Sequence, residues 1–401
     1  MPDLNFTDWF GIYSVIILII IIRGYWVSHK RVKKLRNDKS FWILKNSPPC
    51  NTNTKVSIII PARDEEKNIA DCVQHALAQT HQNIEVIVLD DNSSDNTLKI
   101  LQQFDDPRLK IIQSQGDALP EGWKGKPWAC QRASRQATGQ WLMFIDADVR
   151  IEPETVAAVI GYSEQHQYQY LTGLDHHIMK SFGERLMHSH FLFNLGFQRD
   201  WYAVNDPNSK LSVGNGRFMV FRKDTYESIG GFEAVADKVL EDEAFGSLIK
   251  ERSIPFHANG LMDLVKVRMY TGATEVFNGW VKTISGSIID GNGGKKISWL
   301  NALIFSLFLT AKFLLLDAFT YLTLMMFICG HLSIWVLPFS LAGILLDHSN
   351  RWMFAKMLGL KAITDLFFHA PGQFMALPIY LFSLYKAAKG SASWKGRQLT
   401  N

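Results

Sequence analysis

The sequence predicts an α/β protein: a Rossmann-like, mostly parallel sheet in the middle of the chain, with transmembrane helices at its N-terminal and C-terminal ends. Apolar, β-branched runs alternate with helical patterns between residues 55 and 148. Such βα units build parallel sheets with helices on both faces. Long apolar stretches at 9–22 and 299–346 flank this part of the chain.

Four strands are expected in the soluble part of the chain, at 56–60, 84–89, 109–112 and 141–145. Apolar residues recur at helical spacing after the first strand, which predicts a helix there. A second helix is expected to begin at Ser94 or Asp95, which are good N-caps, and to run through Phe104. A third helix is expected over 127–137.

Mainly acidic clusters follow three of these strands, at 63–66, at Asp90-Asp91, and at Asp146 with Asp148. Ligands of open α/β sheets bind beyond the carboxyl ends of the strands, so we expect the three clusters to border one site. Asp146 and Asp148 are spaced i, i+2 at the tip of a buried strand and face the same side. Paired carboxylates in that position suit Mg²⁺ or Mn²⁺ bridging to a diphosphate.

The composition argues against several other classes of protein. A formal net charge of +4, with no long blocks of Lys and Arg, does not indicate a nucleic-acid partner. The four cysteines are scattered and form no Cys-x-x-Cys, so neither a disulfide framework nor a zinc site is expected. No glycine-rich dinucleotide motif or P-loop is present, and phosphate binding is therefore expected to rely on a metal.

The apolar stretches predict a multi-pass protein of the cell membrane. Residues 9–22 carry no charge and precede the basic run 29–36, which places the N-terminus outside and residue 30 onward in the cytoplasm. The stretch 299–346 has the length of two spans, with the cleaner one in 319–346. The run 374–385 contains Pro378 and is short for a span, so we interpret it as interfacial or re-entrant. Lys312, Asp317 and His331 interrupt the two predicted C-terminal spans.

Taken in order, the motifs resemble those of the family 2 glycosyltransferases. The resemblance rests on 58–66, 89–95, Asp146-Ala147-Asp148, 230–232 and Glu241-Asp242, and it covers about residues 56 to 268. It implies the nucleotide-sugar-binding glycosyltransferase A fold. Two positions depart from the family's usual pattern, because Asp64 replaces an Asn and Asn92 replaces a frequent Gly.

The resemblance also implies roles for individual residues. Mg²⁺ or Mn²⁺ is the implied cofactor, coordinated by Asp148. Asp242 is the implied base, which removes the proton of an acceptor hydroxyl during an inverting transfer. Glu241 and Gly231 would lie on the acceptor side. The implied nucleotide-sugar-binding residues are Pro61, Ala62, Arg63, Glu65, Asp90, Asp91, Lys126 and Asp146.

Together with the apolar stretches, the resemblance divides the chain into five parts. We expect a transmembrane anchor (1–29), a basic cytoplasmic linker (30–54), a catalytic domain (55–290), a C-terminal membrane region of about two spans plus an interfacial segment (291–390), and a cytoplasmic tail (391–401).

Shorter matches at 122–129 and 394–398 resemble the membrane-anchored enzymes of the carotenoid (diaponeurosporenoate) and hopanoid pathways. No Gln-x-x-Arg-Trp follows Glu241-Asp242, so transfer of a single sugar is expected rather than polymerisation. We therefore expect transfer from a nucleotide-sugar, by default a UDP-sugar, to a lipid or isoprenoid acceptor at the cytoplasmic membrane face. The alternatives are a polyprenyl-phosphate sugar transferase and a non-catalytic membrane scaffold with a decayed transferase domain.

Three features also have plainer interpretations. Lys126 is equally well explained as a solvated residue at a helix start. The run 240–243 also fits a solvated acidic helix start, although the order of the motifs favours Asp242 as the base. His188 and His190, in the aromatic segment 182–202, fit a buried amphipathic helix better than a metal site. The same segment would suit a helix in the cytoplasmic interface that presents a lipid acceptor.

Overall fold

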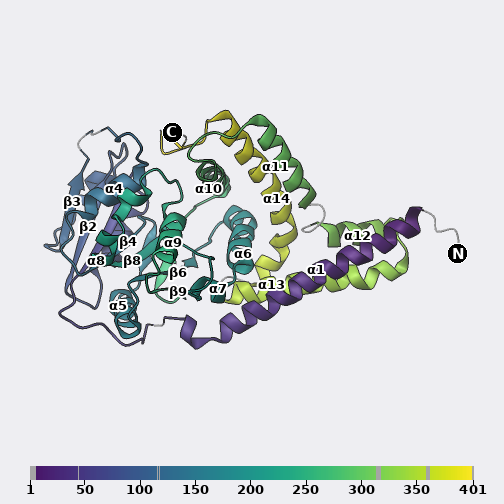
Figure 1. Cartoon of the computed structure of the whole chain (residues 1–401), viewed down its shortest axis with the longest axis horizontal. Coiled ribbons are helices and arrows are strands. Elements are labelled where there is room, and N and C mark those ends of the chain that lie inside the picture. The colour runs from purple at the N-terminus through teal and green to yellow at the C-terminus, as the bar shows by residue number, and fades with distance from the viewer. Residues whose placement is uncertain are drawn as a thin grey trace.

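The computed structural model describes residues 6–43, 45–114, 116, 118–312, 318–357 and 362–399. A central sheet lies at one end of an elongated molecule, and the N-terminus lies at the other (Figure 1). The sheet has seven strands in the order β3 (Leu109–Gln113), β2 (Ile84–Asp90), β1 (Val56–Ala62), β4 (Trp141–Ile145), β8 (Phe218–Arg222), β6 (Tyr170–Leu174) and β9 (Phe256–Gly260).

Most neighbours in this sheet are parallel. Strands β3, β2, β1 and β4 run parallel to one another, as do β6 and β9, whereas β8 is antiparallel to both of its neighbours. The predicted α/β class with a mostly parallel sheet is therefore confirmed. A smaller sheet of β5 (Val149–Ile151), β10 (Val265–Val267) and β7 (His176–His177) begins directly after Asp148.

Alternate side chains of β1 pack into two separate cores, because successive residues of a strand face opposite sides of the sheet. Ile59 packs with Ala129 of α4 (Gly125–Ser134) on one face. Ile58 and Ile60 pack with Val73 of α2 (Ile69–Leu77) on the other. Burial on both sides explains why the strand reads as a continuous apolar run.

The predicted strands agree with the structure to within two residues, whereas two helices differ at their ends. The helix expected through Phe104 is only α3 (Thr97–Leu101), and its N-cap is Asn96. Asp95 still contributes, because its carboxylate accepts a hydrogen bond of 2.9 Å from the backbone N–H of Thr97. Helix α4 begins two residues before the predicted start, at Gly125.

Further helical elements lie around the sheet. They are η1 (Lys39–Phe41), α5 (Thr155–His166), the π-helical turn η2 (Glu184–His188), α6 (Ser189–Gln198), α7 (Trp201–Asn205), α8 (Lys223–Ser228), η3 (Gly231–Val235), α9 (Glu241–Glu251) and α10 (Ala273–Gly291). The aromatic segment 182–202 thus forms three short elements rather than one helix, and His188 and His190 are buried as expected.

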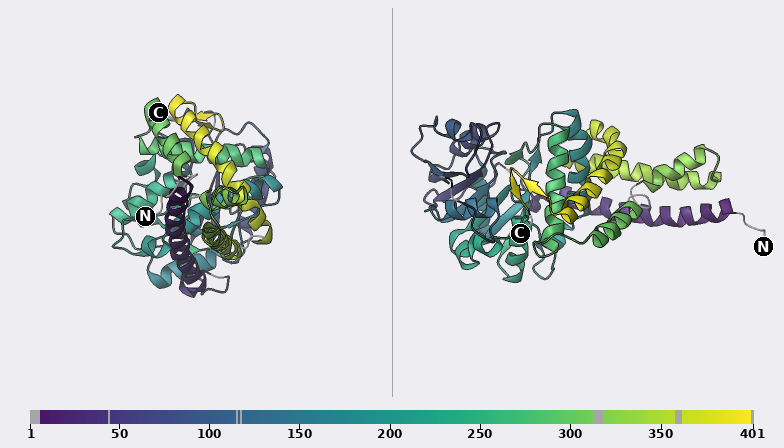
Figure 2. Two further views of the ribbon diagram at one scale, coloured as in Figure 1. Left: turned by 90° about the vertical axis from the view of Figure 1, so that its right-hand side faces the viewer. Right: turned by 90° about the horizontal axis from the view of Figure 1, so that it is seen from above.

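Helix α1 (Phe6–Asn37) and the pair α12 (Phe319–Ile328) and α13 (Leu337–Met357) project side by side from the body of the molecule (Figure 2). Near their outer ends, a Cβ on Gly11 would lie 3.2 Å from the ring of Trp335. Nearer the body, His29 Nδ1 lies 2.8 Å from Asn350 Oδ1. Within the described chain, residues 11–37 of α1 form the one helix long and apolar enough to cross a membrane.

The C-terminal region differs from the predicted spans. The segment 319–346 is not a single helix, because α12 ends at Ile328 and the chain turns at Gly330, where φ is +78°, and passes through η5 (Ile334–Val336). The run 374–385 is part of the long helix α14 (Ala362–Lys389), which holds Pro371 and Pro378, so it is not a short separate segment. Helix α11 (Trp299–Lys312) precedes them, and Asp317 lies outside the described residues.

Candidate active site

A cavity of about 600 Å³ lies at the carboxyl ends of β1, β2 and β4. This is the position expected for a ligand site in an open α/β sheet. The predicted site residues that line it are Pro61, Ala62, Arg63, Glu65, Asp91, Lys126, Asp146, Asp148, Glu241 and Asp242. We call it the polar pocket. The three acidic clusters of the sequence therefore do meet in one site, joined by the acids of α9.

Two predicted site residues, Asp90 and Gly231, do not line the polar pocket. Asp90 is buried at the end of β2, where its Oδ2 accepts a hydrogen bond from the backbone N–H of Ser93. Gly231 has a φ of +54°, and a Cβ there would lie 2.7 Å from the ring of Tyr226. Both residues influence the conformation of loops beside the pocket, but they do not form part of its surface.

The two departures from the family pattern occupy left-handed backbone positions, with φ of +51° at Asp64 and +56° at Asn92. Asp and Asn tolerate this conformation better than other residues with a Cβ. Each side chain also ties its loop to a neighbour: Asp64 Oδ1 accepts from the N–H of Ser94 at 2.7 Å, and Asn92 Oδ1 from that of Gly116 at 2.8 Å. The departures are therefore compatible with the loop geometry.

Lys126 joins the acids that follow β4 to those at the start of α9. Its ammonium group lies 2.7 Å from Asp146 Oδ1, 2.8 Å from Glu241 Oε1 and 3.0 Å from the carbonyl oxygen of Gly216. Burial alone would lower the pKa of Lys126, but the two carboxylates raise it well above its ordinary value. Lys126 does lie at the start of α4, where it is partly exposed and serves as the counter-ion of two carboxylates in the pocket.

Asp148 has the properties of a cation ligand. Its Oδ1 is buried without a hydrogen-bond partner. Burial, together with the charges of Asp146 and Glu65, raises the pKa of Asp148 to about 7. No group of three or more His, Cys, Asp or Glu side chains within the described residues forms a complete metal site. One or two carboxylates nevertheless fit Mg²⁺ or Mn²⁺, which commonly take their remaining ligands from water and substrate phosphates.

Asp242 lies at the N-terminus of α9 with its carboxylate held by the backbone. Its Oδ2 accepts a hydrogen bond of 2.7 Å from the N–H of Gly216, and its Oδ1 one of 2.9 Å from the N–H of Glu243. Glu241 is buried, and burial raises its pKa although Lys126 opposes the shift. Glu243 pairs with Arg199 at 2.5 Å. The acidic helix start is therefore a set of fixed, paired carboxylates rather than an exposed run.

Residues 57–230 match the model of the family described as Glycosyl transferase family 2. The chain carries a family 2 glycosyltransferase domain. Two Staphylococcus aureus proteins, the 4,4'-diaponeurosporenoate glycosyltransferases of strains USA300 and MRSA252, are 28% and 29% identical to it over 264 residues, which is 64% of this chain and 67% of theirs. The domain and these relatives make the protein a glycosyltransferase.

The fold has a counterpart among solved structures. The mannosyltransferase PcManGT from Pyrobaculum calidifontis, solved in complex with GDP-Man and Mn²⁺, matches 96% of this chain and 100% of its own. The TM-score is 0.50 and the sequence identity is 17%, so the likeness concerns the fold alone. The predicted glycosyltransferase A fold is confirmed.

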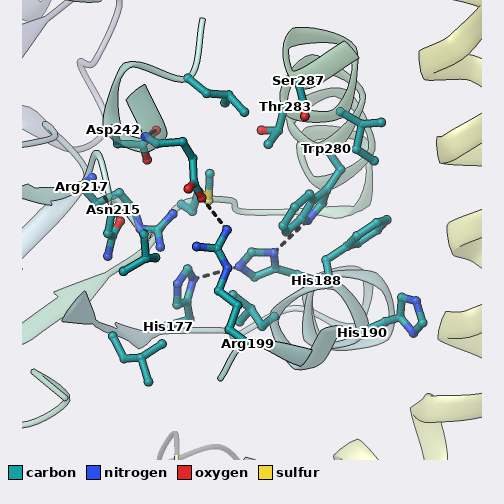
Figure 3. A pocket seen from close by; sticks show the side chains of 18 of the residues that line it. His177, His188, His190, Arg199, Asn215, Arg217, Asp242, Trp280, Thr283 and Ser287 are labelled. Atoms are coloured by element: carbon teal, nitrogen blue, oxygen red, sulfur yellow. Dashed lines mark hydrogen bonds and ion pairs between the residues drawn. The ribbon is translucent and has the colours of Figure 1, made fainter. Parts of the chain in front are cut away.

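The glycosyltransferase has a second cavity, of about 500 Å³, on the other side of Asp242. We call it the apolar pocket. Its wall away from the sheet is formed by α10, α11 and α14, through Ile284, Ile288, Leu309, Ala376, Leu377 and Tyr380. Figure 3 shows Asp242 and Arg217 on the side of the sheet, with Trp280 and Ser287 of α10 opposite them.

Several residues of the apolar pocket were missed by the sequence analysis. Arg217, just before β8, pairs with buried Asp175 through Nε at 2.6 Å and Nη2 at 3.3 Å. Arg217 and His177 hold the pKa of Asp175 well below its usual value, against the effect of burial. The only sequence signal for Arg217 was its place between Gly216 and an apolar strand.

Asp175 also anchors a chain of aromatic side chains in the glycosyltransferase. His177 Nε2 lies 3.0 Å from Asp175 Oδ1. His188 Nε2 lies 2.9 Å from His177 Nδ1, and the indole N–H of Trp280 donates to His188 Nδ1 at 3.0 Å (Figure 3). Burial lowers the pKa of both histidines, so both are neutral near pH 7. These contacts hold His177, His188 and Trp280 in place where they line the apolar pocket.

Gly216 lies where any side chain would disturb the site. A Cβ there would be 3.0 Å from Glu241 Oε1, 3.0 Å from Lys126 Nζ and 3.2 Å from Asp242 Oδ2. We expect Gly216→Ala to lower kcat/KM about tenfold, since displacements of less than 1 Å at reacting groups have effects of this size. Steady-state kinetics, with the melting temperature as a measure of folding, test this.

The control is Gly291→Ala, because a Cβ on Gly291 has no neighbour within 4 Å. It should leave both quantities unchanged. If Gly216→Ala retains full activity, the carboxylates and Lys126 do not need the arrangement seen in the structure.

Proposed function

We propose that this glycosyltransferase transfers a single sugar, with inversion, from a nucleotide-sugar to a lipid or isoprenoid acceptor of carotenoid or hopanoid type, at the cytoplasmic face of the membrane. The observation that carries the proposal is that the polar and the apolar pocket meet at Asp242. Both pockets are lined by Arg217, Leu240, Asp242, Met269 and Thr283. A polar donor and an apolar acceptor therefore have adjoining sites on either side of one carboxylate.

The polar pocket suits the donor. The carboxylates of Glu65 and Asp91 offer acceptors for ribose hydroxyls and base N–H groups, and Arg63 donates to the carbonyl oxygen of Asp91 at 2.8 Å, which fixes that loop. A divalent cation, Mg²⁺ or Mn²⁺, would be held by Asp148 near Asp146 and would offset the charge of the departing diphosphate. A UDP-sugar is the proposed donor, by likeness to the family.

Asp242 is the proposed base. Its two backbone hydrogen bonds hold the carboxylate in one orientation at the junction of the pockets. As the acceptor oxygen bonds to the anomeric carbon, the bond from that carbon to the diphosphate oxygen breaks, and Asp242 takes the proton of a hydroxyl acceptor. An acceptor carboxylate is already ionised near pH 7 and attacks without losing a proton. Because the acceptor and the diphosphate lie on opposite faces of the sugar, the configuration at the anomeric carbon inverts.

The surroundings of the apolar pocket support a lipid acceptor. Helix α11, which lines it through Leu309, exposes a row of large apolar side chains: Trp299, Leu300, Leu303, Ile304, Phe305, Leu307 and Phe308. Contiguous apolar surface of this kind marks contact with a membrane or a partner. The S. aureus relatives are glycosyltransferases of 4,4'-diaponeurosporenoate, which is a carboxylate. We propose that α1 spans the membrane with its basic end, 29–36, in the cytoplasm.

The proposal is tested with protein purified in detergent. UDP- and GDP-sugars are offered with Mn²⁺ or Mg²⁺ and one of three acceptors: a carotenoid carboxylic acid, a hopanoid polyol or a polyprenyl phosphate. We expect one donor to be consumed with either of the first two. Turnover only with the polyprenyl phosphate would establish the alternative enzyme, and binding of no donor would favour the non-catalytic scaffold.

The apolar pocket should determine the affinity for the acceptor. Ser287 of α10 lines it and is exposed, so a larger side chain there fills space without disturbing a core. We expect Ser287→Trp to raise the KM of the acceptor about tenfold, with the KM of the donor unchanged and Ser287→Ala as the control. An equal rise in both KM values would show that the pocket does not hold the acceptor.

A further inference from the structure

The segment that follows α14 folds back onto the polar pocket. Strands β11 (Ser393–Trp394) and β12 (Arg397–Gln398) form an antiparallel hairpin, which lies between the sheet and the C-terminal helices (Figure 2). Trp394, Lys395, Arg397 and Gln398 line the polar pocket together with the loops after β1 and β2. We call this segment, 393–398, the C-terminal hairpin.

Two cations of the hairpin contact acids proposed to bind the nucleotide. Arg397 forms an ion pair with Asp91, whose carboxylate is buried, and the contact from Nη2 to Oδ1 measures 3.1 Å. Lys395 Nζ lies 2.5 Å from Glu65 Oε1. A buried carboxylate is costly unless a counter-ion and hydrogen bonds accompany it. Arg397 is that counter-ion for Asp91.

The contacts run in both directions between the hairpin and the loop after β1. Lys395 Nζ also donates to the carbonyl oxygen of Arg63 at 2.6 Å, and Arg63 Nε donates to the carbonyl oxygen of Lys395 at 3.2 Å. Arg63 in turn reaches the carbonyl oxygen of Asp91. The loops after β1 and β2 are thus both held by one short segment that lies more than 300 residues away in the sequence.

The turn of the hairpin has a lysine, Lys395, at a position where its backbone conformation is unfavourable. Lys395 and Gly396 have φ of +46° and +78°, a pair of left-handed residues typical of a type I′ turn. Asn is the residue normally preferred at the first of these positions, and a lysine there is conformationally unfavourable. The contacts of its ammonium group with Glu65 and Arg63 account for its presence.

Space beside the hairpin is also restricted. A Cβ on Gly125, the first residue of α4, would lie 2.3 Å from Arg397 Nη1. The guanidinium group therefore lies directly over the start of the helix that carries Lys126. On its other side the segment is anchored by Lys124, which donates to the carbonyl oxygen of Leu399 at 2.7 Å.

We propose that the C-terminal hairpin is part of the donor site: it forms one wall of the polar pocket, and Arg397 and Lys395 position Asp91 and Glu65 for a nucleoside diphosphate. This inference rests on the proposed function. It adds residues of a separate segment, outside the catalytic domain, to the machinery that binds the donor. Arg397 and Lys395 are positioning residues, since they act through the two acids.

The test compares four single variants of the full chain. Arg397→Gln removes the charge, Arg397→Lys keeps a charge without the forked contact, and Lys395→Asn removes the ammonium group while suiting the left-handed turn. Lys389→Gln, at the exposed end of α14 and outside both pockets, is the matched control. Calorimetry measures the Kd of UDP and of GDP with Mn²⁺, and kinetics gives kcat and both KM values.

We expect Arg397→Gln to raise the Kd of the nucleoside diphosphate and the KM of the donor about tenfold, with a smaller rise for Arg397→Lys and for Lys395→Asn. The KM of the acceptor and the Lys389→Gln values should stay as in the wild type. The melting temperature of Arg397→Gln should fall, because buried Asp91 loses its counter-ion, so binding is measured well below the melting temperature of each variant. Unchanged nucleotide binding in Arg397→Gln overturns the inference. Tighter nucleotide binding also overturns it, because the hairpin would then block the donor site. Wild-type protein that binds no nucleoside diphosphate overturns the proposed function and the inference together.

Discussion

Replacing Asp242 with Asn is expected to lower kcat by about 10²–10⁴-fold, the contribution typical of a positioned general base. The amide cannot take the proton of an acceptor hydroxyl, although it has the shape of the carboxylate. The KM of the donor should change little, because Asp146, Asp148 and Lys126 stay in place on the donor side. Steady-state kinetics with saturating acceptor measures both quantities.

Asn at this position could destabilise the start of α9, and a measurement of folding detects this. Oδ2 of Asp242 accepts from the N–H of Gly216, so an Asn must present its oxygen there and turn its NH₂ group toward the N–H of Glu243. The melting temperature shows whether this loosens α9. Glu251→Gln, at the exposed far end of the same helix, is the matched control. Activity of Asp242→Asn near the wild-type level would indicate an acceptor that needs no base, which is either an ionised carboxylate or a phosphate.

The sequence predicted the central sheet closely, because its strands are buried on both faces and read as uninterrupted apolar runs. Trp141–Ile145 is found as expected, and the neighbouring strands extend by at most two residues. The sequence also predicted most of the residues named here in the polar pocket, because the carboxyl ends of neighbouring parallel strands lie at the same edge of a sheet. Asp90 and Gly231 show the limit of motif matching, which cannot separate residues that touch a ligand from residues that shape a loop.

Contacts between distant segments could not be predicted in the same way. Arg217 has no motif of its own, and its role follows from buried Asp175, 42 residues earlier. The match at 394–398 was visible as a resemblance, but nothing local connects Arg397 to Asp91. The helices of the C-terminal region differ from the expected segments for a related reason: hydropathy detects apolar length, whereas the turn at Gly330 depends on a single left-handed residue.

Replacing Asp148 with Ala is expected to abolish metal-dependent turnover, with a loss of at least about 100-fold, because a bound cation stabilises the departing diphosphate by several kcal/mol. Two of the cationic side chains in the polar pocket are already engaged, because Lys126 is shared between Asp146 and Glu241 and Arg217 is paired with Asp175. A divalent metal at Asp148 would supply the positive charge that these two side chains do not offer.

The measurement is donor turnover and UDP affinity, each with Mn²⁺ and with EDTA. Wild-type protein should lose both donor turnover and UDP affinity in EDTA. For Asp148→Ala, each of the two quantities should be the same with Mn²⁺ as with EDTA. Asp105→Asn, an exposed carboxylate outside the polar pocket, should behave as the wild type. If the wild type keeps its turnover in EDTA, then side-chain cations must neutralise the diphosphate: either Arg268 and Lys282 of the polar pocket, or Lys126 and Arg217 after leaving their carboxylate partners. The unpartnered oxygen of Asp148 must then serve a purpose other than metal binding.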